Sequence, residues 1–95
     1  MEKNPLLNRN RRSYPRFKVD SFGFLRNKGA TIPILIRDIS SRGVGFFSEV
    51  SLEPGASVEI DANIPFFNFY LSKRGKVVYC YKEREDFFRS GLDFR

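Results

Sequence analysis

Two short polar segments carry the residue types with which this chain could bind a charged ligand. Residues 38–43 (Asp-Ile-Ser-Ser-Arg-Gly) supply a carboxylate, two hydroxyls and a glycine, and residues 11–16 (Arg-Arg-Ser-Tyr-Pro-Arg) supply three arginines. A guanidinium presents a planar fork of donors that matches phosphate oxygens or the O6 and N7 edge of guanine. A carboxylate accepts from the N1 and N2 donors of guanine, which adenine does not offer in that pattern. Together the segments suit a ligand that has both phosphates and purine edges.

The residues around these segments predict how they are held. Pro15 restricts Tyr14 to extended geometry, so residues 12–16 lead in extended form into the first strand. Residues 38–43 lie at a corner between two apolar runs. At this corner the Ser40 hydroxyl can bond the ligand or close the turn onto its own backbone. Gly43 would let the backbone turn sharply and approach the ligand where a Cβ would clash.

Alternation of apolar and polar residues predicts six short strands, and no segment shows a convincing helical period. The expected fold is all-β, a small six-stranded antiparallel barrel that is closed or nearly closed. We also expect a bulge at Gly23, a hairpin turn with positive φ at Gly29, an edge or bulge at Pro33, and an interruption near residues 73–75. The strands are expected at residues 16–26, 31–39, 44–48, 57–64, 69–81 and 87–94.

Charge is distributed unevenly along the 95 residues. The net charge is +6, of which the first 18 residues contribute +5 and the remaining 77 only +1. A general DNA or RNA binder spreads its basic groups along a face or groove. This distribution instead suits a small anion caught between an arm and a body. We therefore expect a mobile basic arm at residues 1–15, which carries the arginines, and a barrel at residues 16–95.

Several function classes are disfavoured by composition. The chain has no histidine and one cysteine, Cys80, so it lacks the commonest metal ligand and acid–base group and cannot form an internal disulfide. No paired carboxylates at identifiable spacing suggest an active site, and we expect neither an enzyme nor a cofactor or metal. No apolar run approaches the roughly 20 residues of a membrane span, and the N-terminus has no signal-peptide pattern. A cytoplasmic protein without membrane contact is expected.

The two polar segments together resemble the motifs of the PilZ domain family, the bacterial receptors for cyclic di-GMP. Arg12-x-x-x-Arg16 matches the RxxxR motif, and Asp38-x-Ser40-x-x-Gly43, 22 residues later, matches the second motif. Weaker landmarks lie at residues 52–55, 77–79 and 91–94, so the resemblance covers residues 11–95. It implies a non-enzymatic receptor that binds the dinucleotide between the arm and the barrel and then switches a downstream protein partner.

The resemblance also implies roles for individual residues. Arg11, directly before the first motif, resembles the arginine that accompanies binding of two intercalated cyclic di-GMP molecules per domain. Tyr79 matches loosely a family position near the ligand, although a place in the barrel core is at least as plausible for it. The residues implied in binding cyclic di-GMP are Arg11, Arg12, Arg16, Asp38, Ser40, Gly43 and Tyr79.

The chain departs from the family at its end. PilZ domains commonly continue into a C-terminal helix, which is missing here because the sequence stops at Arg95. A minimal domain, a fragment of a longer protein, or a homo-oligomer that covers this barrel end would each account for it. Two alternative functions also remain open. One is a PilZ-like adaptor between proteins that binds no nucleotide, and the other is a small barrel that binds single-stranded nucleic acid.

Overall fold

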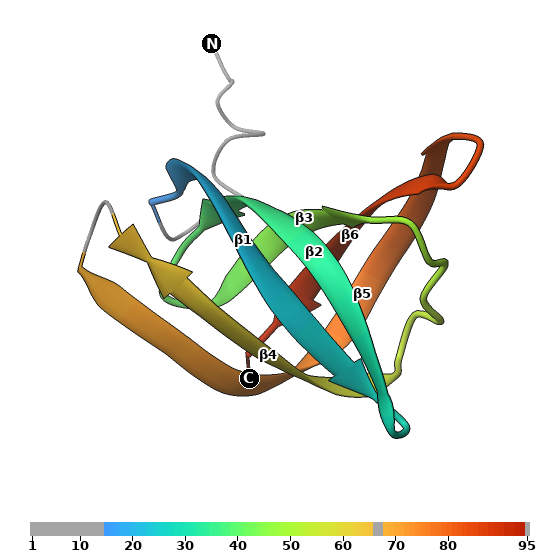
Figure 1. Ribbon diagram of the computed structural model, residues 1–95, viewed down its shortest axis with the longest axis horizontal. Helices are drawn as coiled ribbons and strands as arrows, with labels where there is room; N and C mark the ends of the chain where they lie inside the picture. The colour runs from blue at the N-terminus through green and yellow to red at the C-terminus, as the bar shows by residue number, and fades with distance from the viewer. Residues whose placement is uncertain (1–14, 66–67, 95) are drawn as a thin grey trace, which may run out of the picture.

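The structure is a computed structural model that describes residues 15–65 and 68–94. It confirms the predicted six-stranded antiparallel barrel (Figure 1). Each strand pairs with two neighbours, in the order β1-β2-β3-β6-β5-β4, and β4 closes the ring onto β1. The strands are β1 (Phe17–Asn27), β2 (Ala30–Ile39), β3 (Gly43–Ser48), β4 (Ser57–Ile64), β5 (Phe69–Arg84) and β6 (Phe87–Asp93).

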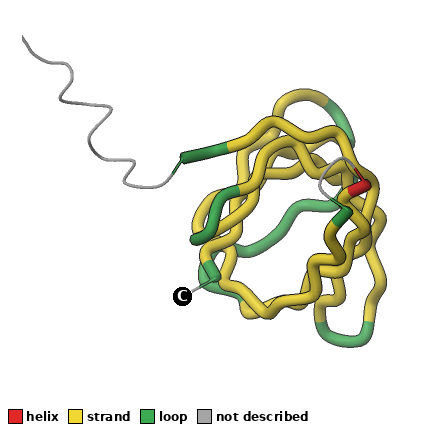
Figure 2. The backbone as a smooth tube through the Cα atoms, turned by 90° about the vertical axis from the view of Figure 1, so that its left-hand side faces the viewer, coloured by secondary structure: helices red, strands yellow, loops and turns green. Residues whose placement is uncertain are grey.

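The strands form a ring around a central space (Figure 2), and the buried hydrophobic residues make up one core cluster. Successive side chains in a strand point to opposite faces, so each strand sends alternate residues inward. Along β1, for example, Val19 and Leu25 are buried while Phe22 and Phe24 between them face outward. Branched aliphatic residues and one central ring, Phe46, make up most of the buried set. The outer face of the barrel is therefore where a site must lie.

Turn residues behave largely as the sequence predicts. Gly29 has φ of 85°, as expected for the hairpin turn between β1 and β2, and Lys28 beside it is also left-handed at 52°. Two consecutive positive φ values characterise the two-residue turn that suits the twist of paired strands. Pro33 lies just before the β2–β3 ladder, which begins at Ile34, so it occupies an edge position on that side of β2.

The predicted bulge at Gly23 is wrong. The register of β1 against β2 shifts between Lys18 and Ser21, whereas Gly23 pairs regularly. A Cβ at Gly23 would lie 2.7 Å from the Cβ of Ala62 on β4. The glycine therefore permits the close approach of β1 and β4 that closes the barrel.

The predicted interruption near residues 73–75 is also wrong, because β5 runs unbroken from Phe69 to Arg84. Gly75 instead makes room for the chain that follows β6. A Cβ there would lie 3.2 Å from the ring of Phe94, which packs partly buried against the core. The Lys73 ammonium lies over the same ring, 5.1 Å from its centre. The described residues contain no α-helix.

Candidate ligand-binding site

An ion pair joins the two polar motifs. Arg16 lies immediately before β1, and Asp38 lies near the end of β2, which pairs with β1. The Arg16 Nη2 is 3.1 Å from the Asp38 Oδ1, and the side chains are 25% and 26% exposed. The barrel thus holds a guanidinium fork and a carboxylate side by side, with part of each surface open to solvent.

Ser40 stabilises the corner between β2 and β3. Its hydroxyl oxygen accepts hydrogen bonds from the backbone N–H groups of Arg42 and Gly43, both at 3.2 Å. Its own N–H donates to the Gly43 carbonyl at 2.9 Å, and the residue is only 8% exposed. Of the two roles that the sequence left open, the structure shows the one in which Ser40 closes the turn. Ser40 therefore positions its neighbours.

Gly43 is required by the packing of β3 against β6. A Cβ at this position would run into the backbone carbonyl oxygen of Leu92 on β6, the neighbour of Asp93, which pairs with Gly43. A neighbouring strand thus requires a glycine here, and the predicted approach of a ligand to Gly43 stays a prediction. The corner and the β3–β6 ladder consequently depend on the same residue.

A row of paired residues crosses the outer face of four strands. Asp38 on β2 pairs with Gly45 on β3, Gly45 with Gly91 on β6, and Gly91 with Tyr79 on β5. The chain neighbours of both glycines are buried in the core, so the row itself lies on the outside. Two residues of the predicted site therefore flank a pair of glycines that carries no side chain.

The two flanking side chains lie low over these glycines. The Asp38 Oδ1 is 3.0 Å from where a Cβ of Gly45 would be, and a Cβ at Gly91 would overlap the ring of Tyr79. The carboxylate and the aromatic ring thus cover the two glycines, which are both buried. The carboxylate offers hydrogen-bond acceptors, and the ring offers a face on which a planar base can stack.

Tyr79 belongs to an aromatic surface outside the barrel and does not belong to the core. Its ring stacks on that of Tyr81, with centroids 5.1 Å apart, and the Arg89 guanidinium lies 5.7 Å from the Tyr81 centroid. Cys80 between the two tyrosines packs against the core, in agreement with the expected alternation. Stacked rings beside a guanidinium extend the surface on which a base could lie.

Gly45 and Gly91 are the residues of this surface that the sequence did not single out as part of a site. Gly91 belongs to one of the weaker PilZ landmarks, but only the pairing of β3 with β6 places it opposite Gly45. Arg11 and Arg12 lie outside the described residues. Within residues 15–65 and 68–94, no cluster of three or more potential metal ligands occurs, and no helix could span a membrane.

Solved structures share this fold at low sequence identity. The Bacillus subtilis inhibitor of motility MotI/DgrA superposes with a TM-score of 0.71 at 16% identity, over 87% of this chain and 42% of that protein. The PilZ domain of YcgR from Escherichia coli, solved with c-di-GMP, gives 0.69 at 16% identity, over 88% and 77%. This chain therefore spans less than half the length of the Bacillus protein.

A search of curated protein sequences gives no significant match. The family model described as PilZ domain, in contrast, matches residues 10–95, which is nearly the whole chain and includes both polar motifs. The closed six-stranded barrel agrees with that match. The chain belongs to the PilZ domain family.

Proposed function

We propose that this protein is a receptor for cyclic di-GMP. The ligand would lie on the outer face of the barrel, between the arginine arm and the row from Asp38 to Tyr79. The observation that carries this proposal is the Arg16–Asp38 ion pair, because it brings the two motifs into contact on the barrel surface. Family membership supports it, as does the similar E. coli domain that was solved with c-di-GMP.

The chemistry of the surface fits a guanine dinucleotide. Asp38 can accept from the N1 and N2 donors of a guanine, while the Arg16 guanidinium can donate to phosphate oxygens or to O6 and N7. Each good bidentate contact of this kind is worth about 1–3 kcal/mol of discrimination. The Tyr79 ring, which lies over Gly91, offers a guanine a face on which to stack.

The arm supplies the switch in this proposal. Arg12 would join Arg16 on the phosphates, and Arg11 would contact a second, stacked ligand molecule. Binding would order the arm against the barrel and create a new surface for a downstream protein, which is a disorder-to-order change without catalysis. Since the ligand is a bacterial second messenger, we expect this to take place in the cytoplasm.

Isothermal titration calorimetry tests the proposal. Cyclic di-GMP, cyclic di-AMP and a short single-stranded RNA are titrated into the wild type, Arg12→Ala and Arg74→Ala. Arg74 is the matched control, because it is 65% exposed and pairs with Glu59 on another part of the barrel. We expect saturable binding of cyclic di-GMP alone, which is lost in Arg12→Ala and kept in Arg74→Ala. A stoichiometry of two that falls in Arg11→Ala would support the role of Arg11.

Two results would reject the receptor. If the folded protein gives no heat with either dinucleotide, the receptor function is rejected and the adaptor function remains. Binding of the RNA with a steep loss of affinity in salt would favour a single-stranded nucleic-acid binder.

A further inference from the structure

An exposed aromatic face lies on the other side of the barrel from the Gly45–Gly91 pair. It is formed by the outward rings of Phe22, Phe24 and Tyr70, which are 79%, 51% and 62% exposed. These rings come from β1 and from β5 across β4, whereas the glycine pair lies on β3 and β6, opposite in the ring of strands. At the usual size of an aromatic side chain, their exposed area totals about 400 Å². The largest apolar patch on a monomer typically has this size and is often functional.

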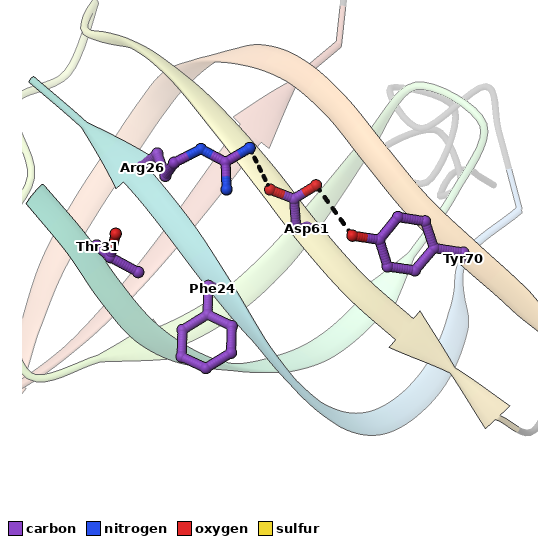
Figure 3. A pocket seen from close by; sticks show the side chains of 5 residues that line it. All are labelled: Phe24, Arg26, Thr31, Asp61 and Tyr70. Atoms are coloured by element: carbon purple, nitrogen blue, oxygen red, sulfur yellow. Dashed lines mark hydrogen bonds and ion pairs between the residues drawn. The ribbon is translucent and has the colours of Figure 1, made fainter. Parts of the chain in front are cut away.

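A hollow lies beside one of these rings. Phe24, Arg26, Thr31, Asp61 and Tyr70 line it, and Figure 3 shows Arg26 and Tyr70 both directed at the Asp61 carboxylate. The Arg26 Nη2 is 2.6 Å from Asp61 Oδ2, and the Tyr70 hydroxyl donates to Oδ1 at 3.3 Å. Phe22 is two residues before Phe24 on the same face of β1 but does not line the hollow. A protruding ring thus stands next to a hollow that has two aromatic walls, Phe24 and Tyr70, and the Arg26–Asp61 ion pair between them.

Charges on this face are compensated within the chain. Arg26 pairs with Asp61 and with Glu59, at 2.6 and 3.3 Å, and Arg74 pairs with Glu59 at 2.7 Å. Two guanidiniums thus balance two carboxylates, although the whole protein carries +6. Two copies could approach through this face without bringing like charges together. Along this face β1 pairs with β4 and β4 pairs with β5, so association there must use side chains.

We propose that a second copy of this chain docks on the aromatic face in a two-fold symmetric dimer. In such an interface a surface is complementary to itself, which a ring next to a hollow allows. Each Phe22 would enter the partner's hollow between Phe24 and Tyr70. The patch of about 400 Å² is half of the roughly 800 Å² per partner in a standard interface. The dimer is therefore weak and reversible, with a dissociation constant in the micromolar range or above.

Sedimentation velocity on the full chain, from about 5 to about 500 µM, tests this dimer by mass action. We expect the wild type to shift toward the dimer with concentration and Phe22→Arg to stay monomeric. Val78→Arg is the matched control, because Val78 is an exposed apolar residue, 53% exposed, and lies eight residues beyond Tyr70 on β5. It introduces the same charge away from the face and should dimerise like the wild type. Added salt should not dissociate the dimer, because it screens the repulsion between two cationic copies.

A mixing experiment tests the symmetry. Phe22→Ser lacks the protruding ring and Tyr70→Ala lacks one wall of the hollow, so neither variant alone can form an intact contact. An equimolar mixture restores one of the two contacts and should associate more than either variant alone. Because Phe22 is so exposed, its variants should melt near the wild-type temperature, which thermal denaturation verifies.

A wild type that is monomeric at every concentration would overturn the proposal. So would a dimer that persists in Phe22→Arg and Phe22→Ser, or one that Val78→Arg abolishes equally, because either result places the contact elsewhere. The test involves no nucleotide, so its outcome is independent of the proposed receptor function.

Discussion

Substitution of Gly43 by alanine tests whether a Cβ that clashes with a neighbouring backbone atom destabilises the barrel more than a Cβ that clashes with a movable side chain. The new Cβ would meet the Leu92 carbonyl oxygen on β6, and that oxygen cannot move without disturbing the β3–β6 ladder. Overpacking of this kind costs about 1–3 kcal/mol. Alanine lowers the entropy of the unfolded chain relative to glycine and returns about 0.4–1 kcal/mol. We expect a net destabilisation of about 1–2 kcal/mol.

Gly91→Ala is the matched control on the facing strand. Its Cβ would meet only the ring of Tyr79, a partly exposed side chain that can turn away. The lost stacking on Tyr81, about 0.5–1.5 kcal/mol, is largely offset by the same entropic gain. Thermal and urea denaturation should therefore show a melting temperature lower by about 4–8 °C per kcal/mol for Gly43→Ala and little change for Gly91→Ala. Equal stability of the wild type and Gly43→Ala, or equal losses in the two variants, would refute the reasoning.

Two further substitutions test the ion pairs. Asp38→Asn removes the carboxylate acceptor and should weaken cyclic di-GMP binding by about 5–150-fold in calorimetry, the equivalent of 1–3 kcal/mol. Its melting temperature should change little, because a partly exposed ion pair contributes only about 1 kcal/mol, and an unchanged affinity would rule out the assigned contact. The pKa of the Asp61 carboxyl is lowered because the Ser72 hydroxyl donates a hydrogen bond to it. Arg26 and Tyr70 also favour the ionised form, and together these contacts outweigh burial, which would raise the pKa. The stability gained from this ionised form is present above the unfolded pKa of about 4 and is lost as pH falls through the lower folded pKa. Urea denaturation should thus show Asp61→Asn to be less stable than the wild type by about 1–2 kcal/mol at pH 7, and a gap that fails to shrink as the pH falls below the unfolded pKa would contradict this account.

The local pattern of the sequence was sufficient to predict the number of strands and their order along the chain. Alternation and turn chemistry depend on neighbouring residues, so the hairpin at Gly29 and the bounds of β4 at Ser57–Ile64 could be predicted. Glycines inside strands were misassigned because their role depends on residues that are distant in the chain. Gly23 was expected to form a bulge and Gly75 to break a strand, but each makes room for a residue far away in the chain. A glycine in a sequence does not show what lies opposite it.

For the candidate site, the sequence by itself supplied the two motifs and the chemistry that they offer to a guanine dinucleotide. Only the tertiary structure decided which groups meet. The pairing of β1 with β2 brings Arg16 to Asp38, and the corner uses the Ser40 hydroxyl for its own backbone. The row that carries Asp38 and Tyr79 over Gly45 and Gly91 depends on the register of β3 against β6, two strands that are far apart in the chain. Register between distant strands is set by how the whole core packs, and no local pattern carries that information.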